Sequence, residues 1–200
     1  MIEFKRKQHV SVSAYQKPKE GNFLCGDSYV VVESEEYVIC AVADGLGSGE
    51  EAHASSTTVV NVIKQHHHES VKRLVELCNN NLVSQRGVVL TVVKFDQREK
   101  KAHFGSVGNI GFLFYSSSGQ IIRPMPRRGF LSGRRINVKT ECFPFDPGSI
   151  FVIYSDGVHL SGIKHENLTD LRSQEEASRF IEKHVKANDD DMTLLVGQLH

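Results

Sequence analysis

The chain has 200 residues, the size of one ordinary domain with a sizeable core, so we expect a single domain over residues 1–200. Its 24 basic and 24 acidic residues give a net charge of zero, which leaves no global field to attract nucleic acid or anionic lipid. Because the longest apolar runs are of strand length, we predict no signal peptide and no membrane span. We therefore expect a cytoplasmic monomer with no nucleic-acid or membrane partner.

The first half of the chain alternates apolar and polar residues, which is the period of half-buried strands. One such segment is HVSVSAY, and two more, SYVVVES and YVICAVA, flank a polar turn at 33–36 and predict a hairpin. Two helices are expected next, over 48–65 and 70–82. The second has apolar residues at i, i+3, i+4 and i+7, a stripe that should face a sheet.

The second half of the chain reads as further strands separated by polar turns, in the manner of an antiparallel meander. A last helix is predicted over 174–185, followed by the closing strand MTLLVGQL. This order of elements favours an α+β fold, with strands packed on strands and helices outside.

Four cysteines lie far apart in the sequence and form no C-x-x-C pair: Cys25, Cys40, Cys78 and Cys142. This spacing is typical neither of a zinc ribbon nor of a dense disulfide framework. We predict that all four are reduced residues of the core.

The glycine-rich stretch CAVADGLGSGEEA, residues 40–52, raises three alternatives: a nucleotide loop, a catalytic serine or a metal loop. Its glycines are spaced G-x-G-x-G and are followed by Glu50, whereas a dinucleotide-binding turn requires G-x-G-x-x-G. Ser48 stands between Leu46 and Glu50 at the outer positions, where a nucleophile elbow has glycines. The first two alternatives therefore fail.

Asp44 and Gly45 remain, placed where a strand is predicted to end. An aspartate there can present both carboxylate oxygens, and a glycine leaves its own carbonyl open to a hard cation. Asp-Gly is also the commonest turn dipeptide, so this segment alone leaves a metal loop and a plain turn both open.

Acidic residues recur at other predicted strand ends. Asp156 and Gly157 follow FVIYS, residues 189–191 are three aspartates before the closing strand, and Asp27 precedes SYVVV. Each can be read as a turn or as a solvated bend, but all four positions could converge on one rim. Carboxylates gathered there would repel and raise each other's pKa unless a cation compensated, so clustering would imply a metal.

Four motifs follow one another along the chain: Gly26–Asp27, A-D-G-x-G at 43–47, S-D-G at 155–157 and D-x-x-T at 190–193. These motifs, in this order, resemble those of the metal-dependent serine/threonine protein phosphatases of the PPM or type 2C class. The resemblance covers almost the whole chain, and GDSYVV, ADGLGSG and GSVGN are most similar to the bacterial branch that acts in stress and sporulation signalling. It implies an αββα sandwich, two packed antiparallel sheets flanked by helices, with a metal site at one end between the sheets.

The resemblance also implies roles for individual residues. Asp44 would bridge two Mn²⁺ or Mg²⁺ ions, and the Gly45 carbonyl would complete the shell of the first. Asp156 and Asp190 would ligate the second ion, and Asp27 would lie near the first. Asp44 and Asp156 are thus the expected catalytic residues, and two metals would activate a water to attack phosphorus without a phosphoenzyme.

The implied function is dephosphorylation of phosphoserine or phosphothreonine in stressosome-type regulatory proteins, as negative feedback on a general-stress sigma factor. The alternative is a catalytically weak member that binds the phosphorylated regulator without hydrolysing it. A metal-linked dinucleotide module is a more distant possibility.

Two positions depart from the family pattern near the first motif. Gly26 stands where the family often has Glu or Gln, so one water-mediated carboxylate is missing. Asn22 replaces an arginine that holds the substrate phosphate, and asparagine lacks the guanidinium fork that suits phosphate. Phosphate capture would then fall to the metals, Lys17 or Lys19.

A third departure lies in the last motif, where Asp191 stands in place of the usual asparagine. The metal ligand could therefore be Asp190 or Asp191. The D-x-x-T spacing to Thr193 favours Asp190.

The segment RPMPRRGFLSGRR, residues 123–135, predicts a mobile basic loop. One basic loop on a neutral protein, without interleaved aromatic residues, is weak support for nucleic-acid binding. In a phosphatase it would guide an acidic or phosphorylated partner, and a merely solvated loop is the alternative.

Overall fold

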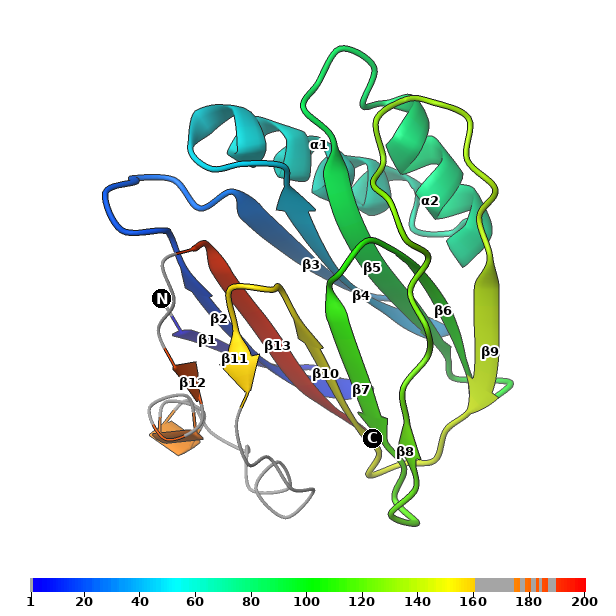
Figure 1. Cartoon of the computed structure of the whole chain (residues 1–200). Helices are drawn as coiled ribbons and strands as arrows, with labels where there is room; N and C mark the ends of the chain where they lie inside the picture. The colour runs from blue at the N-terminus through cyan, green and yellow to red at the C-terminus, as the bar shows by residue number, and fades with distance from the viewer. Residues whose placement is uncertain (1, 161–174, 177–178, 181–182, 184, 187–189) are drawn as a thin grey trace.

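The structure is a computed structural model that describes residues 2–160, 175, 176, 179, 180, 183, 185, 186 and 190–200. Two antiparallel sheets lie face to face, and helices α1 and α2 cover the outer side of one of them (Figure 1). The predicted α+β sandwich of two packed antiparallel sheets is confirmed. The helix predicted over 174–185 falls largely outside the described residues.

The five-stranded sheet carries the two helices and has the strand order β3-β4-β5-β6-β9. Its strands are β3 (Asp27–Glu33), β4 (Tyr37–Gly45), β5 (Val88–Asp96), β6 (Lys101–Val107) and β9 (Thr140–Pro144). β3 and β4 form the predicted hairpin, which sets the register along both strands. Asp27, the first residue of β3, lies opposite Asp44 near the end of β4.

The six-stranded sheet has the order β1-β2-β13-β10-β7-β8 and joins the two ends of the chain in its centre. Its strands are β1 (Ile2–Arg6), β2 (Val10–Lys17), β13 (Met192–Leu199), β10 (Ile150–Tyr154), β7 (Gly111–Tyr115) and β8 (Ile121–Ile122). A separate pair is formed by β11 (His159–Leu160) and β12 (Val185–Lys186). The sequence pattern did not indicate β1, the edge strand.

Both helices predicted in the first half are present, as α1 (Glu50–His66) and α2 (Val71–Asn80). Ser70 caps α2 by accepting the Arg73 N–H at 3.3 Å. α1 has several β-branched residues, which lowers its intrinsic propensity, but its apolar face is buried on β3 and β4. Among the described residues, no helix is long and apolar enough to cross a membrane.

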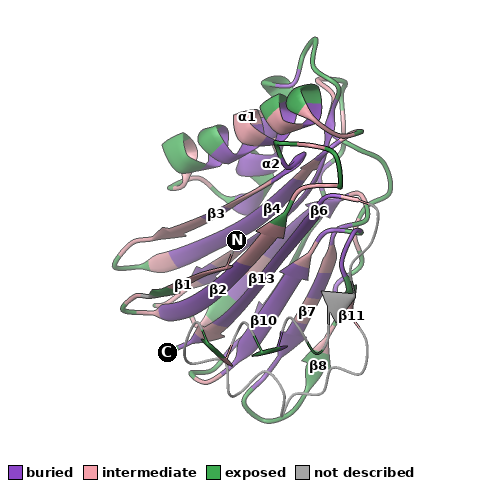
Figure 2. Ribbon diagram, turned by 90° about the vertical axis from the view of Figure 1, so that its left-hand side faces the viewer, coloured by how far each residue is buried: buried purple, intermediate pink, exposed green. Residues whose placement is uncertain are grey.

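The main core lies between the sheets, where the central strands are buried along most of their length (Figure 2). Phenylalanine rings meet there from both sheets, with Phe95 of β5 at 5.0 Å from Phe151 of β10 between ring centroids. A second apolar cluster joins α1 and α2 to the outer face of the five-stranded sheet. These two layers fix the strand ends that carry the acidic motifs.

The expectation of one meander is wrong for the second half of the chain. After β6 the chain leaves the five-stranded sheet and β7 pairs in the other one, while β9 returns to β6. Apolar alternation marks a strand but does not say which sheet it joins, so the exchange was not readable from the pattern. The edge strand β9 also leaves Cys142 exposed, whereas the other three cysteines are buried as predicted.

Candidate metal centre

A pocket of about 270 Å³ lies at the end of the sandwich where strands of both sheets terminate. Asp44 enters it from the end of β4, Asp156 from the turn after β10, and Asp190 from the residues before β13. Its lining is completed by Lys19, Leu46, Gly47, Ser48, Val89 and Asn109. The structure thus brings together acidic residues that the sequence separates by more than a hundred positions.

The hairpin register places Asp27 beside Asp44. Asp27 is 1% exposed, and neither of its carboxylate oxygens has a hydrogen-bond partner among the described residues. Burial raises its pKa to about 7, with a further contribution from Asp191, although the nearby Ser155 and Thr193 hydroxyls oppose the shift. A buried carboxylate with no partner is costly, and it indicates that a counter-charge belongs here.

The Asp44 carboxyl shows the same imbalance more strongly. Burial raises its pKa to about 9, and the negative charges of Asp27, Asp156, Asp190 and Asp191 add to the shift. Without a cation, this carboxyl therefore holds its proton at neutral pH. A divalent ion would reverse that by supplying positive charge.

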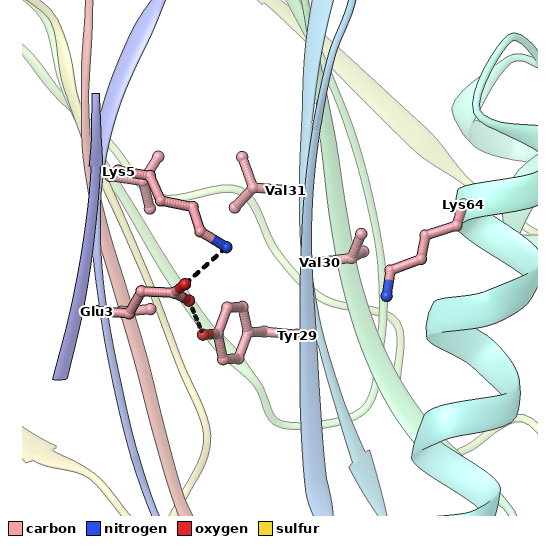
Figure 3. A pocket seen from close by; sticks show the side chains of 8 residues that line it. Glu3, Lys5, Tyr29, Val30, Val31 and Lys64 are labelled. Carbon is pink, nitrogen blue, oxygen red and sulfur yellow. Dashed lines mark hydrogen bonds and ion pairs between the residues drawn. The ribbon is translucent and has the colours of Figure 1, made fainter. Parts of the chain in front are cut away.

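A second pocket, at the edge between the two sheets, shows how a carboxylate is satisfied elsewhere in this protein. There Glu3 of β1 pairs with the Lys5 ammonium at 2.9 Å and accepts the Tyr29 hydroxyl of β3 at 2.8 Å (Figure 3). These contacts lower the pKa of Glu3, with its hydrogen bond to Lys5 the largest cause. At Asp27, by contrast, no described residue forms a hydrogen bond with either carboxylate oxygen.

Asp156 is exposed, and its carboxylate is oriented by a side chain from the turn between β6 and β7. The side-chain amide of Asn109 donates a hydrogen bond to Asp156 Oδ2 at 2.7 Å. Asn109 follows Gly108, whose φ of 118° is a conformation that favours glycine. Sequence reasoning missed this role, although Asn109 ends the GSVGN motif.

The two glycines of the Asp-Gly pairs are required by close backbone approach. A Cβ on Gly45 would stand 2.1 Å from the Ala52 carbonyl oxygen in α1, and one on Gly157 would stand 2.1 Å from the Asp191 carbonyl oxygen. No side chain can be accommodated at that distance without moving the main chain. These contacts hold the turn after β4 against α1 and the turn after β10 against the start of β13.

Asp190 and Asp191 have different surroundings. Asp190 lines the pocket and its Oδ1 accepts the Asp191 N–H at 2.8 Å. Asp191 is 4% exposed; its Oδ1 accepts the Lys19 N–H at 2.8 Å, and its Oδ2 has no partner among the described residues. That free oxygen lies 2.6 Å from where a Cβ on Gly26 would be. The two departures from the family pattern are therefore in contact, and the carboxylate of Asp191 occupies space beside the missing side chain at position 26.

Lys17 and Lys19, the two lysines expected to capture the substrate phosphate, also have different surroundings. Lys19 lines the pocket, whereas the Lys17 side chain is exposed at the end of β2. Asn22 lies near the start of α1, with its Oδ1 3.9 Å from where a Cβ on Gly49 would be. Lys19 is thus the cation best placed to meet an anion in the pocket.

The residues around the pocket fit divalent cations. Within the described part of the chain, no three His, Cys, Asp or Glu side chains already close on one point as a ligand set. The pocket is nevertheless lined by the carboxylates of Asp44, Asp156 and Asp190. Burial and the neighbouring carboxylates raise the pKa of Asp44, and buried oxygens of Asp27 and Asp191 have no partner among the described residues. Hard divalent cations prefer such oxygen ligands and supply the charge that is missing.

Comparisons with known proteins agree with this geometry. The family of stage II sporulation protein E (SpoIIE) matches residues 34–200. The phosphoserine phosphatase RsbX of Bacillus subtilis (strain 168) is 34% identical over 199 residues, which is 100% of both chains. The crystal structure of RsbX in complex with magnesium superposes with a TM-score of 0.90, again over 100% of both chains.

Two further solved structures share the fold. A structure from the bacterial stressosome superposes with a TM-score of 0.86 at 27% identity, over 96% of this chain and 100% of the other. The PP2C phosphatase domain of SpoIIE from Bacillus subtilis superposes with a TM-score of 0.76 at 18% identity, over 100% of this chain and 64% of the other. The fold is that of the PP2C phosphatases. The chain belongs to the SpoIIE family of these enzymes.

Proposed function

We propose that the protein is a metal-dependent phosphoserine or phosphothreonine protein phosphatase, with residues 1–200 acting as one phosphatase domain. Its substrates are phosphorylated stressosome-type regulatory proteins, and their dephosphorylation gives negative feedback on general-stress sigma-factor signalling. The observation that carries the proposal is the pocket lined by Asp44, Asp156 and Asp190, with the buried Asp27 paired opposite Asp44 in the hairpin and without a hydrogen-bond partner for its carboxylate among the described residues. Similarity to RsbX and to the stressosome structure supports the substrate class.

Asp44 would hold both of two Mn²⁺ or Mg²⁺ ions, and the Gly45 carbonyl would help to hold the first. Asp156 and Asp190 would hold the second ion, and Asp27 would help to hold the first. When bound, two such ions lower the pKa of a water and stabilise in-line attack on phosphorus. The magnesium complex of RsbX supports a divalent cation in this fold.

The remaining residues of the pocket position and attract the substrate. The Asn109 amide fixes the orientation of the Asp156 carboxylate. Hydrogen bonds of this kind keep a metal-ligating side chain in place. Lys19 offers the positive charge that the phosphate needs in the absence of an arginine at Asn22. Gly47 leaves one wall of the pocket without a side chain, so a phosphoserine can approach the carboxylates.

The test is phosphate release from a phosphorylated stressosome scaffold protein, with and without Mn²⁺. We expect Mn²⁺-dependent release by the wild type and by the control Asp146→Asn, an exposed aspartate outside the pocket. Asp44→Asn should lower this release about a thousandfold, and Asp156→Asn should lower it to a smaller extent. Absence of release by the wild type at saturating metal, with the phosphoprotein still bound, would instead support a binding module that does not hydrolyse its ligand.

A further inference from the structure

The segment of residues 123–139, here called the basic loop, has a charge that the rest of the protein does not share. It contains no acidic residue, in a chain whose net charge is zero. Its six basic residues are all exposed: Arg123, Arg127, Arg128, Arg134, Arg135 and Lys139. A local positive field of this kind attracts acidic ligands even when the whole protein is neutral.

Several arginines elsewhere on the surface are paired with carboxylates. Arg73 pairs with Glu76 in α2, and ion pairs also join Arg86 to Glu51 and Arg98 to Glu36. Among the described residues, no carboxylate lies within ion-pair distance of a basic side chain of the basic loop. Within the described part of the chain, the charges of the basic loop are therefore not neutralised by an ion pair and are available to a partner.

The backbone of the basic loop is held in place, which differs from the mobile loop that we expected. Arg127 donates its N–H to Ser106 at 3.1 Å and accepts from Gly108 at 2.8 Å, while Leu131 exchanges two hydrogen bonds with Val88 at 2.8 and 2.9 Å. Further along, the buried Asn79 side chain binds the backbone of 132–134. A surface that is already ordered loses less entropy when it binds a partner.

These anchors place the basic loop beside the acidic pocket. Val88 precedes Val89, and Gly108 precedes Asn109; both following residues line the pocket. The loop therefore borders the proposed catalytic site, and a partner bound to it would lie within reach of the carboxylates.

Apolar side chains and a groove accompany the charges. Met125 is 82% exposed and Phe130 47%, both large for a surface position. A groove of about 540 Å³ runs between the loop and strands β6 and β9, lined by residues that include Phe104, Pro126 and Lys139. Rims of charge around apolar anchors are typical of protein interfaces.

We propose that the basic loop binds an acidic segment of the substrate phosphoprotein, and so selects which phosphoprotein reaches the pocket. This rests on the proposed function. Charge complementarity commits the occupant to an acidic polypeptide. Nucleic acid is disfavoured, since the aromatic side chain that lines the groove, Phe104, is buried and offers no free face on which a base could stack.

The test compares two synthetic phosphoserine peptides, one flanked by a run of glutamates and one by glutamines, in the presence of Mn²⁺. The variant is Arg127→Glu/Arg128→Glu/Arg135→Glu, whose side chains make none of the anchoring hydrogen bonds. The matched control, Lys72→Glu/Arg73→Glu/Arg98→Glu, makes the same change of charge at exposed positions of α2 and the β5–β6 turn. Activity on para-nitrophenyl phosphate, which has no flanking segment, reports on the pocket alone.

We expect the wild type to prefer the glutamate peptide, and high salt to weaken this preference. The variant should raise KM for the glutamate peptide about tenfold while kcat and para-nitrophenyl phosphate hydrolysis stay unchanged. The proposal is overturned if the wild type shows no preference, if the control behaves like the variant, or if single-stranded DNA or phosphatidylserine vesicles compete for the loop better than the acidic peptide. If no substrate is hydrolysed, the proposed function fails, and fluorescence anisotropy of the glutamate peptide still decides on docking.

Discussion

The two Asp-Gly turns of the acidic pocket have the same sequence and opposite surroundings. Gly45 and Gly157 play the same part, because each allows a backbone carbonyl to approach to a distance that excludes a Cβ. The aspartates differ. Asp44 is largely removed from water and its pKa rises to about 9, whereas Asp156 is exposed and held by the Asn109 amide.

This difference shows that the dipeptide determines the backbone and the neighbours determine the carboxylate. Asp44 lies opposite Asp27 in a hairpin, so its environment is set by strand register and burial. Asp156 is held by the Asn109 side chain, which comes from another segment. We therefore expect substitutions at the Asp44 turn to change charge balance and stability, and substitutions around Asp156 to change orientation.

The largest expected effect is on catalysis at the buried turn. Asp44→Asn should lower kcat/KM for phosphoserine hydrolysis about a thousandfold, since metals contribute several kcal/mol of transition-state stabilisation. Asp156→Asn should retain more activity than Asp44→Asn, because only one ion depends on Asp156. Equal losses of kcat/KM in the two variants at saturating Mn²⁺ would contradict the different roles proposed for Asp44 and Asp156.

The glycines should behave alike where the aspartates do not. Gly45→Ala and Gly157→Ala should each lower the free energy of unfolding by about 3 kcal/mol, because the added methyl overlaps a carbonyl oxygen. Gly119→Ala is the control: its φ is also unfavourable for alanine at 86°, but no atom lies within 4 Å of the added Cβ, and we expect a loss of about 1 kcal/mol. Urea unfolding measures all three, and a pocket glycine no costlier than Gly119 would contradict the packing.

The buried turn should also make stability depend on pH when metal is removed by a chelator. The pKa of Asp44 is raised in the folded state, so the folded protein holds this proton more tightly than the unfolded chain does. The resulting contribution to the free energy of unfolding is complete below the ordinary pKa of 3.8 and is lost as pH rises toward about 9. Asp27 adds a loss that is complete near pH 7, the value to which its pKa is raised. Metal-free protein should therefore become less stable from pH 4 to pH 9, Asp44→Asn should flatten this dependence, and Mn²⁺ should oppose it. A stability that rises over the same window would contradict the assignment.

A smaller effect is expected at the exposed turn. Asn109→Ala removes the hydrogen bond that orients Asp156 and should lower kcat about tenfold, as is usual for residues that hold a metal ligand in place. When activity is titrated with Mn²⁺, the variant should reach half-maximal activity at a higher Mn²⁺ concentration than the wild type. A purely structural role would not produce this shift. Asn61→Ala, an exposed asparagine of α1, serves as the control and should leave both unchanged.

Much of the fold was predictable because its signals are local. The β3–β4 hairpin, α1 and α2 follow from alternation, a polar turn and a 3.6-residue period within short windows. The strand exchange after β6 was not, because alternation is the same in either sheet. Cys142 was misplaced for a related reason, since a cysteine on an edge strand has the same local pattern as a buried one.

At the candidate site, the acidic positions were readable from strand ends, but their partners were not. The contact of Asn109 with Asp156 joins positions 47 residues apart, and the approach of Asp191 to Gly26 spans most of the chain. The first contact follows from the pairing of β7 with β10 in one sheet, and the second from the packing of one sheet on the other; no window of sequence contains either. That Asp27 has no hydrogen-bond partner within the described part of the chain likewise depends on the folded neighbourhood.

Calorimetric titration with Mn²⁺ measures the binding of the ions to the pocket rather than the reaction that they support. We predict two bound ions for the wild type, loss of both in Asp44→Asn, and retention of one in Asp156→Asn. If Asp44→Asn binds Mn²⁺ as the wild type does, Asp44 does not hold the ions, which would contradict its proposed role in the pocket.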